Sequence, residues 1–162
     1  MITRERLDTL LAQARAELLA RREAQGVWRG HLSSSALATA TALSALSLAA
    51  DPADEPLRQG AAAWLATDQN ADGGWGDTPD SPSNLATTLL CLSALRLAEG
   101  KSGGSMAGDG GYETETVAVR ARRYITHEAG HGPEAITAAL ARRYGADRTF
   151  AVPILMNCAL AG

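Results

Sequence analysis

The stretch of sequence that decides the fold is residues 60–75, GAAAWLATDQNADGGW. It opens with a helical run of small and apolar residues and closes in a Gly-x-Trp turn at Gly73 and Trp75. The same pair of residue types occurs 47 residues earlier, at Gly26 and Trp28. A pattern that recurs at such a spacing within one chain is typical of helical-repeat architectures.

Each of the first two repeats consists of a charged amphipathic helix, the Gly-x-Trp turn and then a helix without charges, and a third, degraded repeat lacks the Gly-x-Trp turn. Ser44-Ala45-Leu46 in the first uncharged helix matches Ser93-Ala94-Leu95 in the second. A helix that is apolar all round needs neighbours on every side, whereas an amphipathic helix buries one stripe. We therefore predict stacked helix pairs, with the charged helix facing water and the uncharged one facing inward. The turn tryptophan is expected to donate its indole N–H to a carbonyl at a helix end.

Hydrophobic periodicity and helix breakers predict an all-α chain with no strand. Helices are expected at about 3–23, 36–50, 57–67, 83–99, 115–128, 133–144 and 150–161. The length indicates one domain, 1–162, made of repeat units at about 3–50, 57–99 and 115–162. Residues 100–111 contain six glycines and are interpreted as a flexible connector.

Composition excludes several classes of function. The net charge is −3, without the basic excess of a nucleic-acid-binding protein, so no nucleic-acid partner is expected. The charged N-terminus lacks the apolar core of a secretory signal, which favours a cytoplasmic location. Residues 32–50 are uncharged but carry seven hydroxyl side chains, which argues against a membrane span. Cys91 and Cys158 are too few for a disulfide framework and are expected to be buried.

Residues 60–75 closely resemble the QW repeat of squalene–hopene and oxidosqualene cyclases. The matching positions are Gly60, Trp64, Leu65, Gln69, Gly73 and Trp75. Gly26 and Trp28 look like the turn of the first repeat, and residues 142–145 and 152–155 resemble later segments. The resemblance implies the N-terminal part of an α/α-toroid, an incomplete barrel, in which Gln69 and Trp75 are structural. Protein prenyltransferase β-subunits and complement-type domains share this architecture.

The resemblance also implies an isomerase that cyclises a linear polyprene by protonating an alkene, without metal or cofactor. Such an enzyme would make peripheral contact with the cytoplasmic membrane face. The family's proton donor lies in an Asp-x-Asp-Asp motif, which this sequence lacks. A proton donor must stay protonated in an apolar cavity, whereas Asp72, Asp77 and Asp109 lie in Gly-rich loops. We therefore expect no catalytic residue in this chain, and a fragment that is inactive alone.

A non-catalytic alternative is a helical-repeat binding or scaffold protein. The uncharged helices at about 36–50 and 84–95 would lack part of their cover if only three repeat units were present. Self-association through these helices would then complete the barrel. Oligomeric state distinguishes this hypothesis from that of a cyclase fragment.

A third reading is a zinc hydrolase, because residues 127–131 match the His-Glu-x-x-His motif. On a continuous helix His127 and His131 would bind the metal and Glu128 would act as general base. Gly130, Gly132 and Pro133 are expected to break that helix. No third ligand is evident, and the candidates by residue type alone are Glu134, Asp109 and Asp147. The simpler interpretation is a helix C-terminus where histidines interact with exposed carbonyls, so no metal site is predicted.

Overall fold

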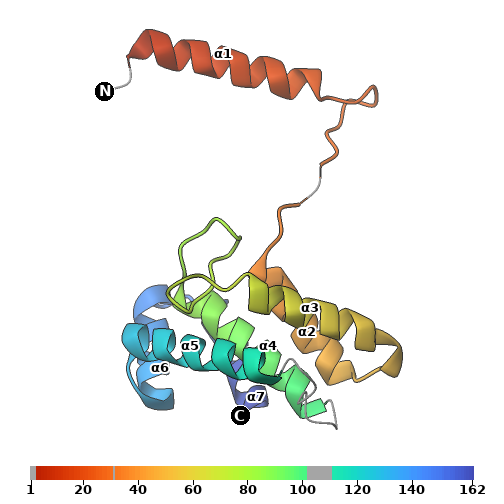
Figure 1. Cartoon of the computed structure of the whole chain (residues 1–162). Coiled ribbons are helices and arrows are strands. Elements are labelled where there is room, and N and C mark those ends of the chain that lie inside the picture. The colour runs from red at the N-terminus through yellow and green to blue at the C-terminus, as the bar shows by residue number, and fades with distance from the viewer. Residues whose placement is uncertain (1–2, 31, 102–110) are drawn as a thin grey trace. The chain divides into compact units, whose positions relative to one another are not determined.

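The computed structural model describes residues 3–30, 32–101 and 111–162 (Figure 1). In these residues the chain is all-α, with no strand, which confirms the predicted fold class. In chain order the elements are α1 (Arg4–Ala20), α2 (Ala36–Ala49), the 3₁₀ helix η1 (Pro52–Asp54), α3 (Glu55–Thr67), α4 (Leu85–Lys101), α5 (Gly111–Ala129), α6 (Gly132–Tyr144) and α7 (Ala151–Ala161). The seven predicted helices are thus all present in the described residues, with small shifts at their ends.

Short polar side chains fix the starts of the uncharged helices. The Ser35 hydroxyl accepts from the Ala38 N–H at 3.2 Å, at the start of α2. Asn84, directly before α4, accepts at its side-chain oxygen from the Thr87 N–H at 2.9 Å. Each bond satisfies a backbone donor that has no partner inside its helix. The helix boundaries therefore follow from local sequence.

The contacts divide the chain into two compact units, Met1–Ser33 and Ser34–Gly162. The first unit contains α1 and the turn that follows it. No residue of α1 is buried. The leucines of its apolar stripe stay largely exposed: Leu7, Leu10, Leu11, Leu18 and Leu19.

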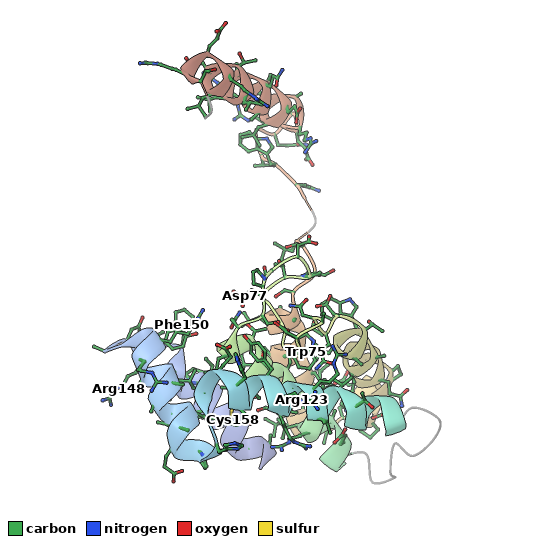
Figure 2. The ribbon with its side chains drawn as sticks, turned by 60° about the vertical axis from the view of Figure 1, so that its left-hand side comes forward. Trp75, Asp77, Arg123, Arg148, Phe150 and Cys158 are labelled. Atoms are coloured by element: carbon green, nitrogen blue, oxygen red, sulfur yellow. The ribbon has the colours of Figure 1, made fainter. Side chains whose placement is uncertain are left out.

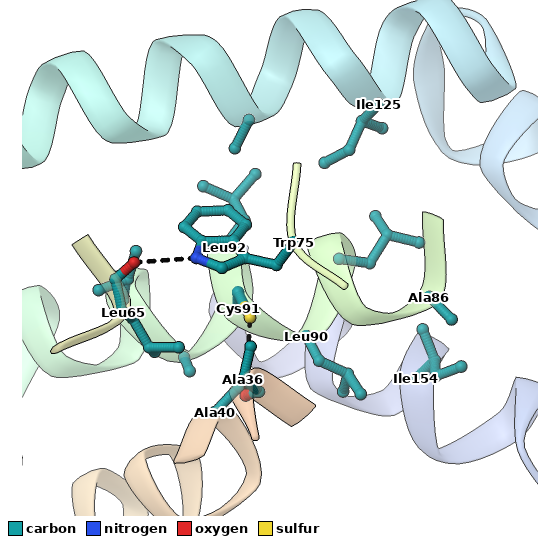
Figure 3. Close-up of a cluster of buried hydrophobic side chains, with 14 of the residues drawn as sticks. Ala36, Ala40, Leu65, Trp75, Ala86, Leu90, Cys91, Leu92, Ile125 and Ile154 are labelled. Atoms are coloured by element: carbon teal, nitrogen blue, oxygen red, sulfur yellow. Dashed lines mark hydrogen bonds between the residues drawn. The ribbon is translucent and has the colours of Figure 1, made fainter. Parts of the chain in front are cut away.

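The second unit is built around α4, which packs against α2, α3, α5 and α7. Figure 3 shows α5 on one side of α4 and both α2 and α7 on the other. Every residue from Leu85 to Leu95 is buried, as predicted for a helix that is apolar all round. The expectation that this helix lacks cover in a three-repeat chain is therefore wrong, because α5 and α7 enclose it.

The other uncharged helix, α2, is covered on one face only. Ala40, Leu43 and Ser47 are buried against the rest of the unit, whereas Leu37 and Leu48 are exposed. Its position beside α4, with α3 as its other main neighbour, leaves one face without a neighbour in this unit. The prediction of an incompletely covered uncharged helix is thus confirmed for α2.

Both cysteines are free thiols, and the predicted burial is confirmed for Cys91 but only in part for Cys158. Cys91 is fully buried, and burial, followed by the charge of Asp68, raises the pKa of its thiol. Burial likewise raises the pKa of Cys158, which is half-buried beside the Ser93 hydroxyl. Among the described residues, no helix combines the length and the apolar character needed to span a bilayer.

The connection from α2 to α3 depends on one left-handed residue and one arginine. Ala50 has φ 55° and donates its N–H to the Leu46 carbonyl at 3.0 Å. The Arg58 guanidinium donates to the Asp51 carbonyl at 2.8 Å and is held in place by Glu55. The positive charge of Arg58 also interacts favourably with the partial negative charge at the C-terminal end of α2.

Replacing Ala50 by glycine is expected to stabilise the fold. Glycine adopts a left-handed backbone without the steric cost that a Cβ brings, so Ala50→Gly should raise the free energy of unfolding by about 0.5–1 kcal/mol. The matched control is Ala42→Gly in the exposed middle of α2, which should lower it by about 0.5–1 kcal/mol. Urea denaturation measures both changes. A loss of stability at Ala50 would contradict the left-handed cap.

Candidate functional site

The Gly-x-Trp turn that ends at Trp75 is the best-defined polar arrangement in the second unit. The Trp75 side chain is fully buried, and its indole N–H donates to the Leu65 carbonyl at 2.9 Å (Figure 3). Its backbone N–H donates to the Thr88 hydroxyl at 3.0 Å. The predicted bond from the turn tryptophan to a helix-end carbonyl is therefore confirmed, since Leu65 lies in the last turn of α3.

Gln69 joins this turn to α5. Its side-chain N–H₂ group donates to the Gly73 carbonyl at 2.9 Å and to the Val117 carbonyl at 3.0 Å. The Arg120 guanidinium returns a bond to the Asn70 carbonyl at 2.7 Å. Gly73 has φ +89°, and a Cβ there would lie 2.6 Å from the Arg120 carbonyl oxygen. Only glycine allows so close an approach between the turn and α5.

The turn in the first unit repeats these bonds 47 residues earlier. The Trp28 indole N–H donates to the Leu18 carbonyl at 2.6 Å. The Arg22 guanidinium donates to the Gly26 carbonyl at 2.8 Å, where the second repeat uses Gln69. Gly26 has φ +82°, in the same left-handed region as its counterpart. The internal repeat seen in the sequence is thus a repeat of hydrogen bonds.

Arg22 is a turn residue that sequence reasoning missed. It stands at the position equivalent to Gln69, so applying the 47-residue offset to the whole turn would have found it. Its guanidinium also lies over the Trp28 ring, 5.3 Å from the ring centroid. Trp28 is 47% exposed, whereas Trp75 is 0% exposed, so the two equivalent bonds lie in different surroundings.

The remaining residues of the matched stretch lie on α3. Leu65 is fully buried, and Trp64 is partly buried against the core. Gly60 is exposed, with open space around the position of a Cβ. Burial therefore decreases from Leu65 through Trp64 to Gly60.

The described aspartates of the Gly-rich loop serve the loop itself. Asp77, labelled in Figure 2, accepts from the Thr87 hydroxyl and from the Asn84 side-chain amide at 2.9 Å. These bonds, that of Thr87 first, lower the pKa of Asp77 below its usual range. Asp72 accepts from the Ser83 hydroxyl at 2.7 Å. Asp109 lies outside the described residues. A carboxyl held in its charged form is the opposite of a proton donor.

The structure places the His-Glu-x-x-His residues on two separate helical segments. His127 and Glu128 lie at the end of α5, 3.0 Å apart between Nδ1 and Oε1. Gly130, with φ +95°, ends that helix, and His131 precedes α6 in an extended conformation. The continuous helix that would align both histidines on one metal is therefore missing. In the described part of the chain, no group of three or more His, Cys, Asp or Glu could hold a metal ion.

Comparison with known proteins identifies the family. The family model described as "Squalene-hopene cyclase N-terminal domain" matches residues 11–132, which is most of the chain. The chain belongs to the squalene–hopene cyclase family. A squalene–hopene cyclase of Zymomonas mobilis subsp. mobilis is 46% identical over 65 residues, a match that covers 40% of this chain and 10% of that protein. The chain thus spans far less than two thirds of this relative. No solved structure matches the chain.

In this member of the squalene–hopene cyclase family, the two turn tryptophans should differ in their contribution to stability. Trp75→Phe leaves a buried carbonyl without its donor and removes packed volume, so it should cost about 2–4 kcal/mol of unfolding free energy. Trp28→Phe should cost less than about 1 kcal/mol, because water can replace the lost bond. Urea denaturation provides the comparison. Equal losses of unfolding free energy in the two variants would contradict the prediction that burial makes Trp75 the more important residue.

The acid dependence of stability should contain a contribution from Asp77. Because its folded pKa is lowered, its stabilising contribution is present above the unfolded pKa of about 3.9 and is lost as the pH falls through the folded value. The unmodified chain should therefore lose more stability between about pH 6 and pH 3 than Asp77→Asn does. Thr87→Val should also reduce the loss of stability at low pH, since it removes the hydrogen bond that lowers the pKa of Asp77 the most. Urea midpoints of the unmodified chain and both variants at the two pH values test this. An equal loss of stability in all three would contradict it.

Proposed function

We propose that the chain forms the N-terminal part of the α/α-toroid of a squalene–hopene-type triterpene cyclase. The carrying observation is the family match over residues 11–132, within which both Gly-x-Trp turns fall. The repeat of hydrogen bonds at Trp28 and Trp75 supports a repeat architecture. The class of reaction is the cyclisation of a linear polyprene by protonation of an alkene, an isomerisation.

In this proposal the matched residues are a structural QW motif. The motif comprises Gly60, Trp64, Leu65, Gln69, Gly73 and Trp75, with Gly26 and Trp28 from the first repeat. Its physical role is to close helix ends, where backbone carbonyls have no partner within the helix. Gln69 supports this role, because its amide joins the carbonyl of its own turn to a carbonyl of α5.

We assign no chemical step to this chain by itself. In the Gly-rich loop, the Thr87 hydroxyl and the Asn84 amide lower the pKa of Asp77 and so hold it in its charged form. The catalytic acid, the polyprene-binding surface and a peripheral contact with the cytoplasmic membrane face belong, in our proposal, to the whole cyclase. That reaction requires neither a metal nor a cofactor.

A second candidate function is a helical-repeat scaffold that associates with itself. It is favoured by exposed apolar side chains on two uncharged helices of the second unit. These are Leu37 and Leu48 of α2 and Val152, Met156 and Leu160 of α7. Sedimentation of the chain distinguishes the two candidates, because only the scaffold requires a stable oligomer.

The cyclase proposal is tested by sequencing the coding DNA past the codon for Gly162 and by assaying squalene turnover. We expect an open frame with further repeats and an Asp-x-Asp-Asp motif. The whole product should convert squalene into cyclic triterpenes, detected by gas chromatography–mass spectrometry, and the 162-residue chain should not. An Asp→Asn change at the motif's proton donor is the matched control and should abolish turnover. A stop codon directly after Gly162, or a folded but inactive whole product, would refute the proposal.

A further inference from the structure

A cavity of about 590 Å³ lies in the second unit between α4, α5, α6 and α7. Its volume falls within the range of about 300–1,000 Å³ that is usual for small-molecule sites. Cys158, labelled in Figure 2, lines it from α7. No part of the Gly-x-Trp turn contributes to this cavity, so the proposed structural motif does not account for it.

The floor of the cavity is apolar and preformed. Leu89 and Leu92 of α4 and Ile125 of α5 line it, and all three are buried. Ile136 of α6 and Leu155 of α7 add apolar walls. Because the floor and the walls come from four helices that pack on one another, the cavity is part of the folded unit.

Two positively charged side chains line the same cavity. Arg96 of α4 and Arg122 of α5 both line it, and among its described lining residues none is Asp or Glu. Arg96 donates to the Gly162 carbonyl at 2.6 Å. Arg122 has no ion pair or hydrogen bond within the described part of the chain. The first residues of α6 also line the cavity, and a helix N-terminus favours an anion.

We propose that this cavity binds a single-chain amphiphile with a carboxylate head group, such as a medium-chain fatty acid. The alkyl chain lies on the floor formed by Leu89, Leu92 and Ile125. The carboxylate lies at Arg122, because a planar guanidinium matches a carboxylate in geometry and charge, whereas Arg96 already bonds Gly162. A neutral hydrocarbon would leave this charge unused.

An alkyl chain also suits the lining better than a polypeptide segment does. A buried polypeptide backbone needs a hydrogen-bond partner for each of its N–H and C=O groups. The buried hydroxyl in the lining, that of Ser93, already bonds the Cys158 sulfur. An alkyl chain requires no such partners and gains from contact with the apolar floor.

Isothermal titration calorimetry with dodecanoate, below its micelle concentration, is the direct test. We expect saturable binding at one site per chain, with dodecanol and acetate each binding at least about tenfold more weakly, because each lacks one of the two recognised parts. Absence of saturable dodecanoate binding would overturn the proposal. Dodecanol binding as tightly as dodecanoate would also overturn it, because Arg122 would then have no role.

Adjacent arginines on α5 provide a matched pair of variants. Arg122→Gln should weaken dodecanoate binding about three- to tenfold, as expected for loss of a partly solvated charge-assisted bond. Arg123→Gln changes the same charge at a neighbouring exposed position that does not line the cavity, and should leave binding unchanged. Equal effects of the two substitutions would indicate general electrostatic adsorption and would overturn the proposal.

A substitution that fills the cavity tests whether dodecanoate binds there or at another apolar surface. Ala159 lines the cavity from an exposed position on α7, so Ala159→Phe should block dodecanoate while leaving the melting temperature nearly unchanged. Undiminished binding by this variant would place the ligand elsewhere and refute the assignment. Sedimentation is measured in parallel. If the unmodified chain dimerises and Ala159→Phe dissociates the dimer, the occupant is a second copy of the chain, and the amphiphile proposal fails.

Discussion

The indole N–H of Trp75 reaches the Leu65 carbonyl across the end of α3, and the surrounding packing depends on that bond. The last carbonyls of a helix have no partner within the helix, and burying them unpaired costs stability. One large side chain resolves this at Leu65, because it supplies the donor and fills the space between α4 and α5 (Figure 3). The adjoining turn can then pack on α5, with Gln69 bonding the Val117 carbonyl.

The two turns show how one set of bonds adapts to two surroundings. In the second unit, Gln69 provides two N–H donors without a charge, which suits a partly buried site facing two carbonyls. In the first unit, Arg22 makes the equivalent bond where its charge stays hydrated, and it also covers the exposed Trp28 ring. A guanidinium in the place of Gln69 would bring an unpaired charge to the interface with α5. The residue type at this position therefore matches the burial of its turn, with Gln69 in the buried turn and Arg22 in the exposed one.

In this member of the squalene–hopene cyclase family, the described aspartates of the Gly-rich loop are part of a hydrogen-bonded framework. The loop carboxylates Asp72 and Asp77 accept hydrogen bonds from Ser83 and Thr87, respectively, and the bonds to Asp77 lower its pKa. A proton donor needs the opposite surroundings, apolar and without such donors. The largest share of the buried interior of the second unit comes instead from the uncharged stretch Leu85–Leu95 of α4, with further buried residues from α2, α5 and α6.

The sequence by itself determined the helices, the repeat and the bond of the turn tryptophan, because each follows from local periodicity or from residues on the same turn. It also determined that Gly130 would break the His-Glu-x-x-His helix. Only the tertiary structure decided that the stretch Leu85–Leu95 of α4 is enclosed while α2 is covered on one face only, although both stretches are uncharged. It alone brought Gln69 to Val117 and assembled the cavity at Arg122, because these contacts join segments whose separation along the chain leaves no periodic signal.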